Sequence, residues 1–450
     1  MTDIIPVIPA LVTFSAVMIL GFIGNYIFNK TQIPSIVWLL LFGLIVGAII
    51  KFYNFDVLSP ESLGNIAGLV GAIAIVVILF DGGINTDIYL LFRGAPRGLL
   101  LTVVGFCLSF IFTMLVVVGL DTAGIINIQG NSFVIGSVLG AIIGGTSSPI
   151  VIPLAYRLKN LQDKTKIISS IESILTDPLC IVVVFAIYYM VFFVQEFDIG
   201  LGISNLVMTF SVGIVLGGAF GFVWLFIMNK TRKEQFSYVL TLAIIFLVYT
   251  VTTVIVGQNQ GGEGAGAIAC LTFGLILGNG KKILKMVNYQ GEGFDMDEET
   301  KHFHSLTSFV IRTFFFVYLG MIVSFQKIDY ILIGIIVLLV LLIARYIAIY
   351  ITTYNGDFEK DDMQTMIVMM PRGLAAAILA VKFGPDFVAR YMPNCKGFFQ
   401  DVAFVVILGT AIITTIGVSI ISHIEIKKMK EKSAEKPIND TISSISDQEK

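Results

Sequence analysis

The chain has 450 residues, of which 56% are hydrophobic and only 13% are charged, and its mean hydropathy is +0.91. This apolar share lies well above that of water-soluble domains, so it excludes a soluble fold and indicates one membrane domain. The formal net charge is -2 and no basic stripe occurs, which argues against a nucleic-acid partner.

Runs of roughly 20 apolar residues, the length that a helix needs to cross a bilayer, recur along the chain with short polar breaks between them. The sequence therefore predicts an all-α membrane protein with about thirteen transmembrane helices. The N-terminus lacks the basic region and cleavage site of a signal peptide, so the first run is expected to remain as a helix. The predicted helices are residues 4–28, 35–52, 64–90, 97–120, 131–157, 167–194, 201–228, 236–256, 263–278, 305–324, 328–353, 363–382 and 397–423.

Lysine and arginine are unevenly distributed between the two sets of loops. The alternate loops that begin with Lys30, together with the C-terminal residues, carry roughly three times as many basic residues as the other set. An odd number of spans places the termini on opposite sides, and the positive-inside rule puts the N-terminus outside and the C-terminus inside. We predict a transmembrane domain at residues 1–426 in the cell membrane and a disordered, Lys/Glu/Ser-rich cytoplasmic tail at residues 427–450.

Charged residues inside the predicted helices are few, and each needs a partner, a water-filled cavity or a function, because a charge at membrane depth costs several kcal/mol. Asp81, in the third helix, is the first of them in chain order. It is either a second titrating group near an ion site or a helix-end residue that is solvated or paired with Arg93 or Arg97. Both interpretations stay open.

The fifth helix contains a break at its centre. The segment Gly140–Pro149 holds the sequence Gly144-Gly145-Thr146-Ser147, and its glycines and proline are expected to unwind the helix. Irregular backbone at membrane depth occurs only where it lines a cavity or is buried in protein. The freed carbonyl groups and the hydroxyls of Thr146 and Ser147 are therefore candidate cation ligands.

The sixth helix carries the densest polar cluster. Glu172 and Asp177 flank Ser173 and Thr176, and the i, i+4 spacing places both carboxylates on adjoining stripes of one helix. Glu172 is either part of an ion site or the structural partner of a buried arginine. Asp177 is the stronger functional candidate, because a carboxylate in a low-dielectric cleft can hold either a proton or a bare cation near neutral pH. One site with two mutually exclusive ligands is the minimum that ion exchange requires.

The twelfth helix has a parallel interruption at Pro371-Arg372-Gly373, after a buried arginine, Arg345, in the eleventh. Either interruption alone could be a simple kink. Two broken helices at corresponding places in the two halves of a chain, however, favour an inverted-repeat transporter with its site at the midplane.

The chain resembles the NhaP-type sodium/proton antiporters and their animal sodium/proton exchanger relatives, of the cation/proton antiporter superfamily. The resemblance covers most of the membrane domain and depends on the order and spacing of several short motifs. Residues 79–85 (LFDGGIN) are similar to the family's FEGGLN, and 172–177 (ESILTD) to its ESLLND. The other matching motifs are residues 274–279 (GLILGN), 342–345 (LIAR) and 371–373 (PRG).

The resemblance implies a dimerization domain and a six-helix core domain, in which the fifth and twelfth helices cross where both unwind. It also implies that Asp177 is the ion- and proton-binding aspartate, with Ser173 as a supporting ligand. Glu172 then pairs with Arg345, and Arg372 is the arginine beside the twelfth-helix break. Asp81 occupies the place of a glutamate that approaches the cation in some members.

Two departures from the family pattern affect the substrate. First, Ser147 replaces an aspartate of the fifth helix, so the site has one carboxylate fewer than the family pattern. The predicted cation- and proton-binding residues are Asp177, Ser173, Thr146 and Ser147, with Asp81 nearby. Na+ or K+ is expected to bind at Asp177. The hydroxyl-rich Ser147-Ser148 pair resembles the Kef-type potassium/proton branch, so K+/H+ exchange is the alternative to Na+/H+ exchange. The residue before Asp177 is a threonine and not an aspartate, and a single titrating acid favours exchange of one cation for one proton.

Other classes of membrane protein are less well supported. A channel would need a filter segment such as TVGYG, and an intramembrane hydrolase would need HExxH or a facing Ser/His pair; the sequence has neither filter nor HExxH, and no enzymatic activity is expected. A non-transporting sensor on the same fold stays open as an alternative function.

The expected partners are the bilayer, H+, Na+ (or K+ or Li+) and, by resemblance, a second copy in a homodimer. No cofactor is expected, and the expected role is pH homeostasis.

Overall fold

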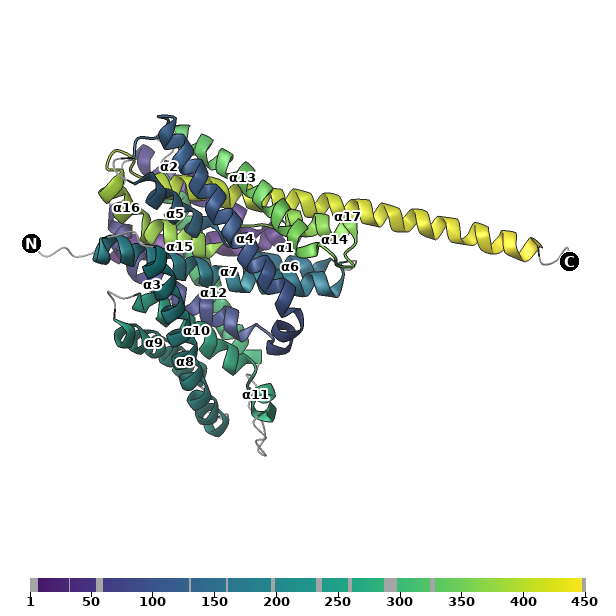
Figure 1. The fold of residues 1–450 in the computed structure, drawn as a ribbon, viewed down its shortest axis with the longest axis horizontal. Coiled ribbons are helices and arrows are strands. Elements are labelled where there is room, and N and C mark those ends of the chain that lie inside the picture. The colour runs from purple at the N-terminus through teal and green to yellow at the C-terminus, as the bar shows by residue number, and fades with distance from the viewer. Residues whose placement is uncertain are drawn as a thin grey trace, which may run out of the picture.

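The structure, a computed structural model, describes residues 7–31, 33–53, 60–128, 131–158, 161–195, 199–231, 237–257, 261–286, 298–323 and 328–446. Every regular element within these ranges is a helix (Figure 1). The helices are α1 Val7–Thr31, α2 Ser35–Tyr53, α3 Pro60–Ile84, α4 Ile88–Thr122, α5 Ser132–Ile143, α6 Ser148–Arg157, α7 Asp163–Tyr189 with a π-helical extension Met190–Val194, α8 Ile199–Thr231, α9 Ser237–Val256, α10 Gly262–Gly278, α11 Gly280–Met286, α12 Glu298–Ile322, α13 Ile328–Thr353, α14 Lys360–Val368, α15 Leu374–Lys382, α16 Gly384–Tyr391 and α17 Phe398–Ser446.

The membrane-spanning character predicted from hydropathy is confirmed. Among the described residues, seven helices are long and apolar enough to cross a membrane, and two bent helix pairs raise this number to nine. Three shorter apolar helices, in α1, α2 and α3, and the broken pair α14/α15 account for the other predicted spans. The chain is a multi-pass membrane protein.

The helices pack in two groups. In the first group, α10 packs against α3, α8 and α9, and α12 packs against α1, α2 and α3. In the second, α4 packs against α5, α7 and α13, and α17 packs against α13, α14 and α15. We call the first set (α1–α3, α8–α10, α12) the panel and the second (α4–α7, α13–α17) the core. Figure 1 shows α8–α10 along one side of the bundle and α13 and α17 along the other.

The third and fourth predicted helices have the wrong boundary. One helix was predicted to continue to residue 90, but α3 ends at Ile84 and α4 begins at Ile88. Asp87 caps α4 by accepting a hydrogen bond from the Tyr89 amide at 2.8 Å. The Asn279 side chain fixes the same turn, since it donates to the Thr86 carbonyl at 2.7 Å and accepts from the Ile88 amide at 3.0 Å. A contact across the fold, and not local hydropathy, sets this boundary.

Two further segments differ from the prediction. The loop after the ninth span begins with a short helix, α11, bent by 79° from α10. The segment predicted as a disordered tail is helical to Ser446, because α17 continues beyond its apolar part and leaves the bundle (Figure 1). Its lysine, glutamate and alanine residues are good helix formers, and they extend a helix that is already nucleated. We call the end of the bundle from which α17 projects the tail end.

Candidate functional site

The two broken spans touch each other at their breaks. α5 and α6 are bent by 41° around residues 144–147, and residues 369–373 separate α14 from α15. The Ser147 amide donates to the Pro371 carbonyl at 2.8 Å. Gly373 lies so close that a Cβ atom there would be 2.4 Å from the Ser147 hydroxyl oxygen. The crossing therefore requires a residue without a side chain at position 373.

Arg372 from the second break stabilises the carbonyl end of the first. Its Nη1 donates to the Gly144 carbonyl at 2.6 Å and its Nη2 to the Ser109 hydroxyl at 3.3 Å, and the residue is 2% exposed. Its own amide donates to the Thr410 hydroxyl at 3.0 Å. The C-terminus of a half-helix carries unpaired carbonyl groups and partial negative charge, which a guanidinium compensates.

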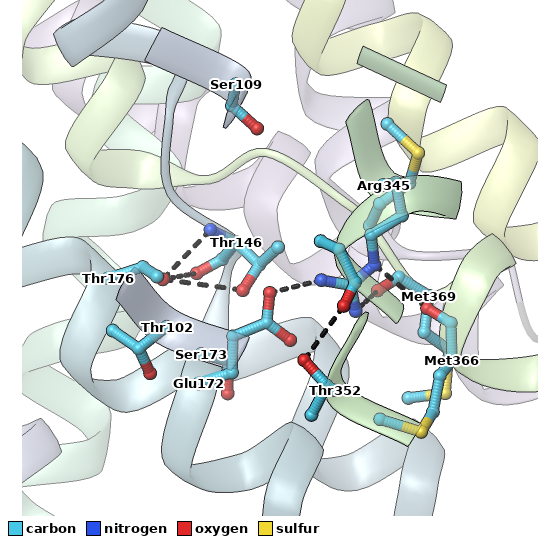
Figure 2. A network of polar contacts seen from close by, with 12 residues as sticks. Thr102, Ser109, Thr146, Glu172, Ser173, Thr176, Arg345, Thr352, Met366 and Met369 are labelled. Atoms are coloured by element: carbon cyan, nitrogen blue, oxygen red, sulfur yellow. Dashed lines mark hydrogen bonds and ion pairs between the residues drawn. The ribbon is translucent and has the colours of Figure 1, made fainter. Parts of the chain in front are cut away.

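Arg345 stabilises the carbonyl end of the other half-helix, α14. Its Nε donates to the Met366 carbonyl at 2.9 Å and its Nη2 to the Met369 carbonyl at 3.0 Å, at the C-terminal end of that half-helix. Its Nη1 forms an ion pair with Glu172 of α7, and both side chains are almost fully buried (Figure 2). Each half-helix that ends at the crossing thus receives one buried arginine. The structure pairs Glu172 with an arginine and does not leave it free for an ion.

Thr176 holds the broken backbone in place, a role that sequence reasoning missed. Its hydroxyl accepts from the Thr146 amide at 3.0 Å and lies 3.3 Å from the Thr146 carbonyl, to which it donates (Figure 2). The Thr146 hydroxyl lies 3.4 Å from the same oxygen. A polar residue directly before Asp177, opposite a predicted break, was the available signal.

Asp177 lies one residue further along α7, is 7% exposed, and has Arg372 as its electrostatic partner. No hydrogen bond to its carboxylate occurs among the residues that the structure describes. Ser173, one turn earlier, is buried and donates to the Ser170 carbonyl of its own helix at 3.0 Å. Asp177 therefore keeps oxygen lone pairs available to a proton or a cation.

Among the residues that the structure describes, Asp81 does not contact the Asp177 site. The Asn85 side chain donates to its carboxylate at 3.0 Å, and its electrostatic partner is Arg312 of α12. Within the described ranges, no contact joins it to Asp177. Of the two arginines considered as partners, Arg97 donates instead to the Asn355 carbonyl, and the side chain of Arg93 is outside the described residues.

A cavity of about 1010 Å³ reaches the crossing from the tail end. Ser147 and Leu374 line it at the crossing, and Arg157, Ser305 and His423 line it toward the tail end. Panel and core helices both contribute to its wall, so the cavity lies between the two groups.

The profile of the family described as "Sodium/hydrogen exchanger, transmembrane" matches residues 15–424, a range that includes the whole crossing. The chain belongs to this family. It is a family of transporters and not of enzymes, and the predicted superfamily is confirmed.

Two individual relatives support the family assignment. The chain is 25% identical over 413 residues to Na(+)/H(+) antiporter 1 of Methanocaldococcus jannaschii, and the alignment covers 87% of this chain and 88% of that one. It is 25% identical over 284 residues to the K(+)/H(+) antiporter NhaP of Alkalimonas amylolytica, of which it spans 44%.

The fold also matches a solved structure. The structure of the sodium proton antiporter MjNhaP1 from Methanocaldococcus jannaschii at pH 8 superimposes with a TM-score of 0.72 at 22% identity, over 93% of this chain and 97% of that one. The fold with two crossed broken helices, predicted from the sequence, is confirmed.

Proposed function

We propose that this exchanger moves Na+ and H+ in opposite directions across the cell membrane, and that the two ions compete for Asp177. The observation that carries the proposal is the position of Asp177. It is a buried carboxylate without a hydrogen-bond donor in the described residues, beside the crossing that the cavity reaches. A proton or a dehydrated cation satisfies such a group, and both cannot do so together.

The charges at the crossing support a cycle that moves no net charge. Glu172 and Arg345 neutralise each other, which leaves Asp177 and Arg372. The site with a protonated Asp177 carries the same charge as the site with an ionised Asp177 and one monovalent cation. One cation then exchanges for one proton, and the exchange is electroneutral.

The proposed ligands of the cation are the Asp177 carboxylate and the nearby oxygen atoms of Ser173, Thr146 and Ser147. Carboxylate, hydroxyl and carbonyl oxygens suit a hard monovalent cation. Asp81 is proposed as a second group that draws cations toward the panel side, with Arg312 as its electrostatic partner.

Potassium is the second candidate substrate. Ser147 stands where the sodium-type family motif that this sequence resembles carries an aspartate, which lowers the negative charge of the site. One relative also bears the name of a K(+)/H(+) antiporter. A site of weaker field favours the larger, more weakly hydrated cation.

The proposed orientation places the tail end in the cytoplasm, because the basic loops lie at this end. The cavity then opens to the inside, and the structure corresponds to an inward-open state. A homodimer stays a prediction from the family resemblance.

Reconstituted vesicles test the proposal. Addition of Na+, Li+ or K+ should dissipate an imposed pH gradient in a saturable way, with Na+ the most effective. Asp177→Asn should abolish exchange while the protein still inserts and purifies as a folded species, since an amide cannot alternate between proton and cation. Exchange by this variant at the wild-type rate, or a wild-type protein that moves no protons with any of the three cations, would contradict the proposal; the latter would favour a sensor.

A further inference from the structure

The end of the core opposite to the tail end is closed by a cluster of aromatic rings. The rings of Phe185 and Phe383 lie 5.0 Å apart, and those of Phe192 and Phe387 lie 5.2 Å apart. Tyr188 stands between them, with its ring 5.1 Å from Phe383 and 5.9 Å from Phe387. This ring cluster (Phe185, Tyr188, Phe192, Phe383, Phe387) joins α7 to the segment after α15.

An ion pair connects this cluster to the panel. Lys382, the last residue of α15, places its Nζ 2.5 Å from Oε2 of Glu263, in the first turn of α10. The same ammonium lies 5.2 Å from the centre of the Phe185 ring and 5.1 Å from that of Phe383. Cation–π contacts of this kind hold an ammonium in place when it is partly desolvated. Lys382 therefore links the core rings to a panel carboxylate.

Lys382 and the Phe185 ring beside it lie on the two elements that carry the site. α15 begins directly after the crossing, and α7 carries Asp177 and, two turns later, Phe185. The cavity reaches the crossing from the tail end. The rings lie on the opposite side of the site, two turns and more beyond Asp177 along α7 and directly after α15. If the chain exchanges ions as proposed above, Asp177 must also become accessible from this opposite end.

We propose that the Glu263–Lys382 ion pair, seated on the rings of Phe185 and Phe383, is the outer gate of this exchanger. It holds panel and core together while the site is open to the tail end. It breaks when the site opens to the other side. Glu263 and Lys382 are then positioning residues, which set the balance between the two states and bind no transported ion. This inference rests on the proposed function.

Native Cys180 provides a reporter for the open outer path. It is buried one turn beyond Asp177 toward the ring cluster, against Gly145 at the break. We would replace the other three cysteines (Cys107→Ser, Cys270→Ala, Cys395→Ser) and apply a membrane-impermeant thiol reagent to the outside of oriented vesicles. The labelling rate of Cys180 is measured without ion gradients, so it reports the gate whether or not the chain exchanges Na+ for H+.

Glu263→Gln and Lys382→Met should each raise the external labelling rate of Cys180 about two- to fivefold, the range that partly exposed ion pairs contribute to an equilibrium. The charge-reversed pair, Glu263→Lys with Lys382→Glu, should return the rate toward that of the parent. The matched control is Asp87→Asn, which removes an ion pair of equal length, 2.5 Å to Lys282, near the tail end. It should not raise external labelling.

An unchanged labelling rate of Cys180 in both single variants would contradict the proposed gate. So would a reversed pair that labels as fast as the single variants, or a control that raises labelling as much as Glu263→Gln does. A protein that shows the expected labelling pattern but exchanges no cation would support the gate and contradict the proposed function, so the two failures are distinguishable.

Discussion

The guanidinium of Arg372 donates a hydrogen bond of 2.6 Å to the carbonyl of Gly144, so an arginine at the break of one span covers the carbonyl end of the other. Arg372 is also the electrostatic partner of Asp177. One side chain thus fixes the geometry of the crossing and sets the charge that the transported ion meets. Changes at Arg372 should affect stability and ion binding together.

Arg372→Lys should lower thermal stability and exchange. A lysine ammonium is a point charge that lacks the planar fork needed to reach both Gly144 and Ser109. Loss of a hydrogen bond to a charged donor typically costs about 1.5–3 kcal/mol. Thermal unfolding in detergent and vesicle exchange measure the two effects. Arg390→Lys is the control, since Arg390 is exposed and lies over the Phe192 ring. An Arg372 variant as stable and active as this control would rule out the capping role.

Glu172 and Arg345 should show strong coupling in a double-mutant cycle. Removal of one partner of a buried pair typically costs about 3–5 kcal/mol, because the other charge is left without a partner. Arg345→Ala should therefore destabilise strongly, and the double variant with Glu172→Ala should lose less than the sum. The Asp163–Lys166 pair, in the same helix, should show little coupling, because its carboxylate is solvent-exposed. Additive losses at Glu172 and Arg345 would mean that the pair does not act as a unit.

Thr176→Val should weaken the crossing without a change in side-chain shape. Valine leaves the Thr146 amide without an acceptor, and a buried unpaired amide costs about 1–3 kcal/mol. Thr176→Ser keeps the hydroxyl and should stay near the wild-type stability. Thermal unfolding of both variants gives the comparison. Equal loss in the two would assign the effect to packing and not to the hydrogen bond.

Exchange by the wild-type protein should be independent of membrane potential. The proton-loaded and cation-loaded forms of the site carry the same charge, so an electric field does not distinguish them. The test sets a K+ diffusion potential with valinomycin and follows the exchange rate with Na+ at fixed pH. A current that follows the potential would show that a second group, with Asp81 the first candidate, also carries a proton.

Ser147→Asp should move the activity profile toward higher pH. An added carboxylate near Asp177 attracts both a cation and a proton, so Asp177 would release its proton only at higher pH. The apparent affinity for Na+ above that pH should rise. Ser147→Asn adds similar volume without charge and should not move the profile. A profile that Ser147→Asp leaves in place would argue that Ser147 lies outside the field of the site.

Hydropathy predicted the helices well where a span is long, continuous and bounded by polar loops, as in α13. It failed at the α3–α4 turn, because Asn279, distant in the sequence, holds the backbone of Thr86 and Ile88. In the tail, whose polar composition predicted disorder, the helix α17 continues to Ser446. Local composition reports burial in lipid, but not the contacts that end or extend a helix.

The sequence by itself determined which residues require an explanation. Asp177, Glu172, Arg345 and Arg372 stand out because a charge at membrane depth is costly, and the two breaks stand out because glycine and proline interrupt helices. The family resemblance implied the pair of Glu172 with Arg345, and the structure contains this ion pair. Only the tertiary structure decided the other partners: Gly144 for Arg372, Thr146 for Thr176 and Glu263 for Lys382. The physical reason is that the cost of a buried charge is a property of one residue, whereas its compensation depends on how distant helices cross.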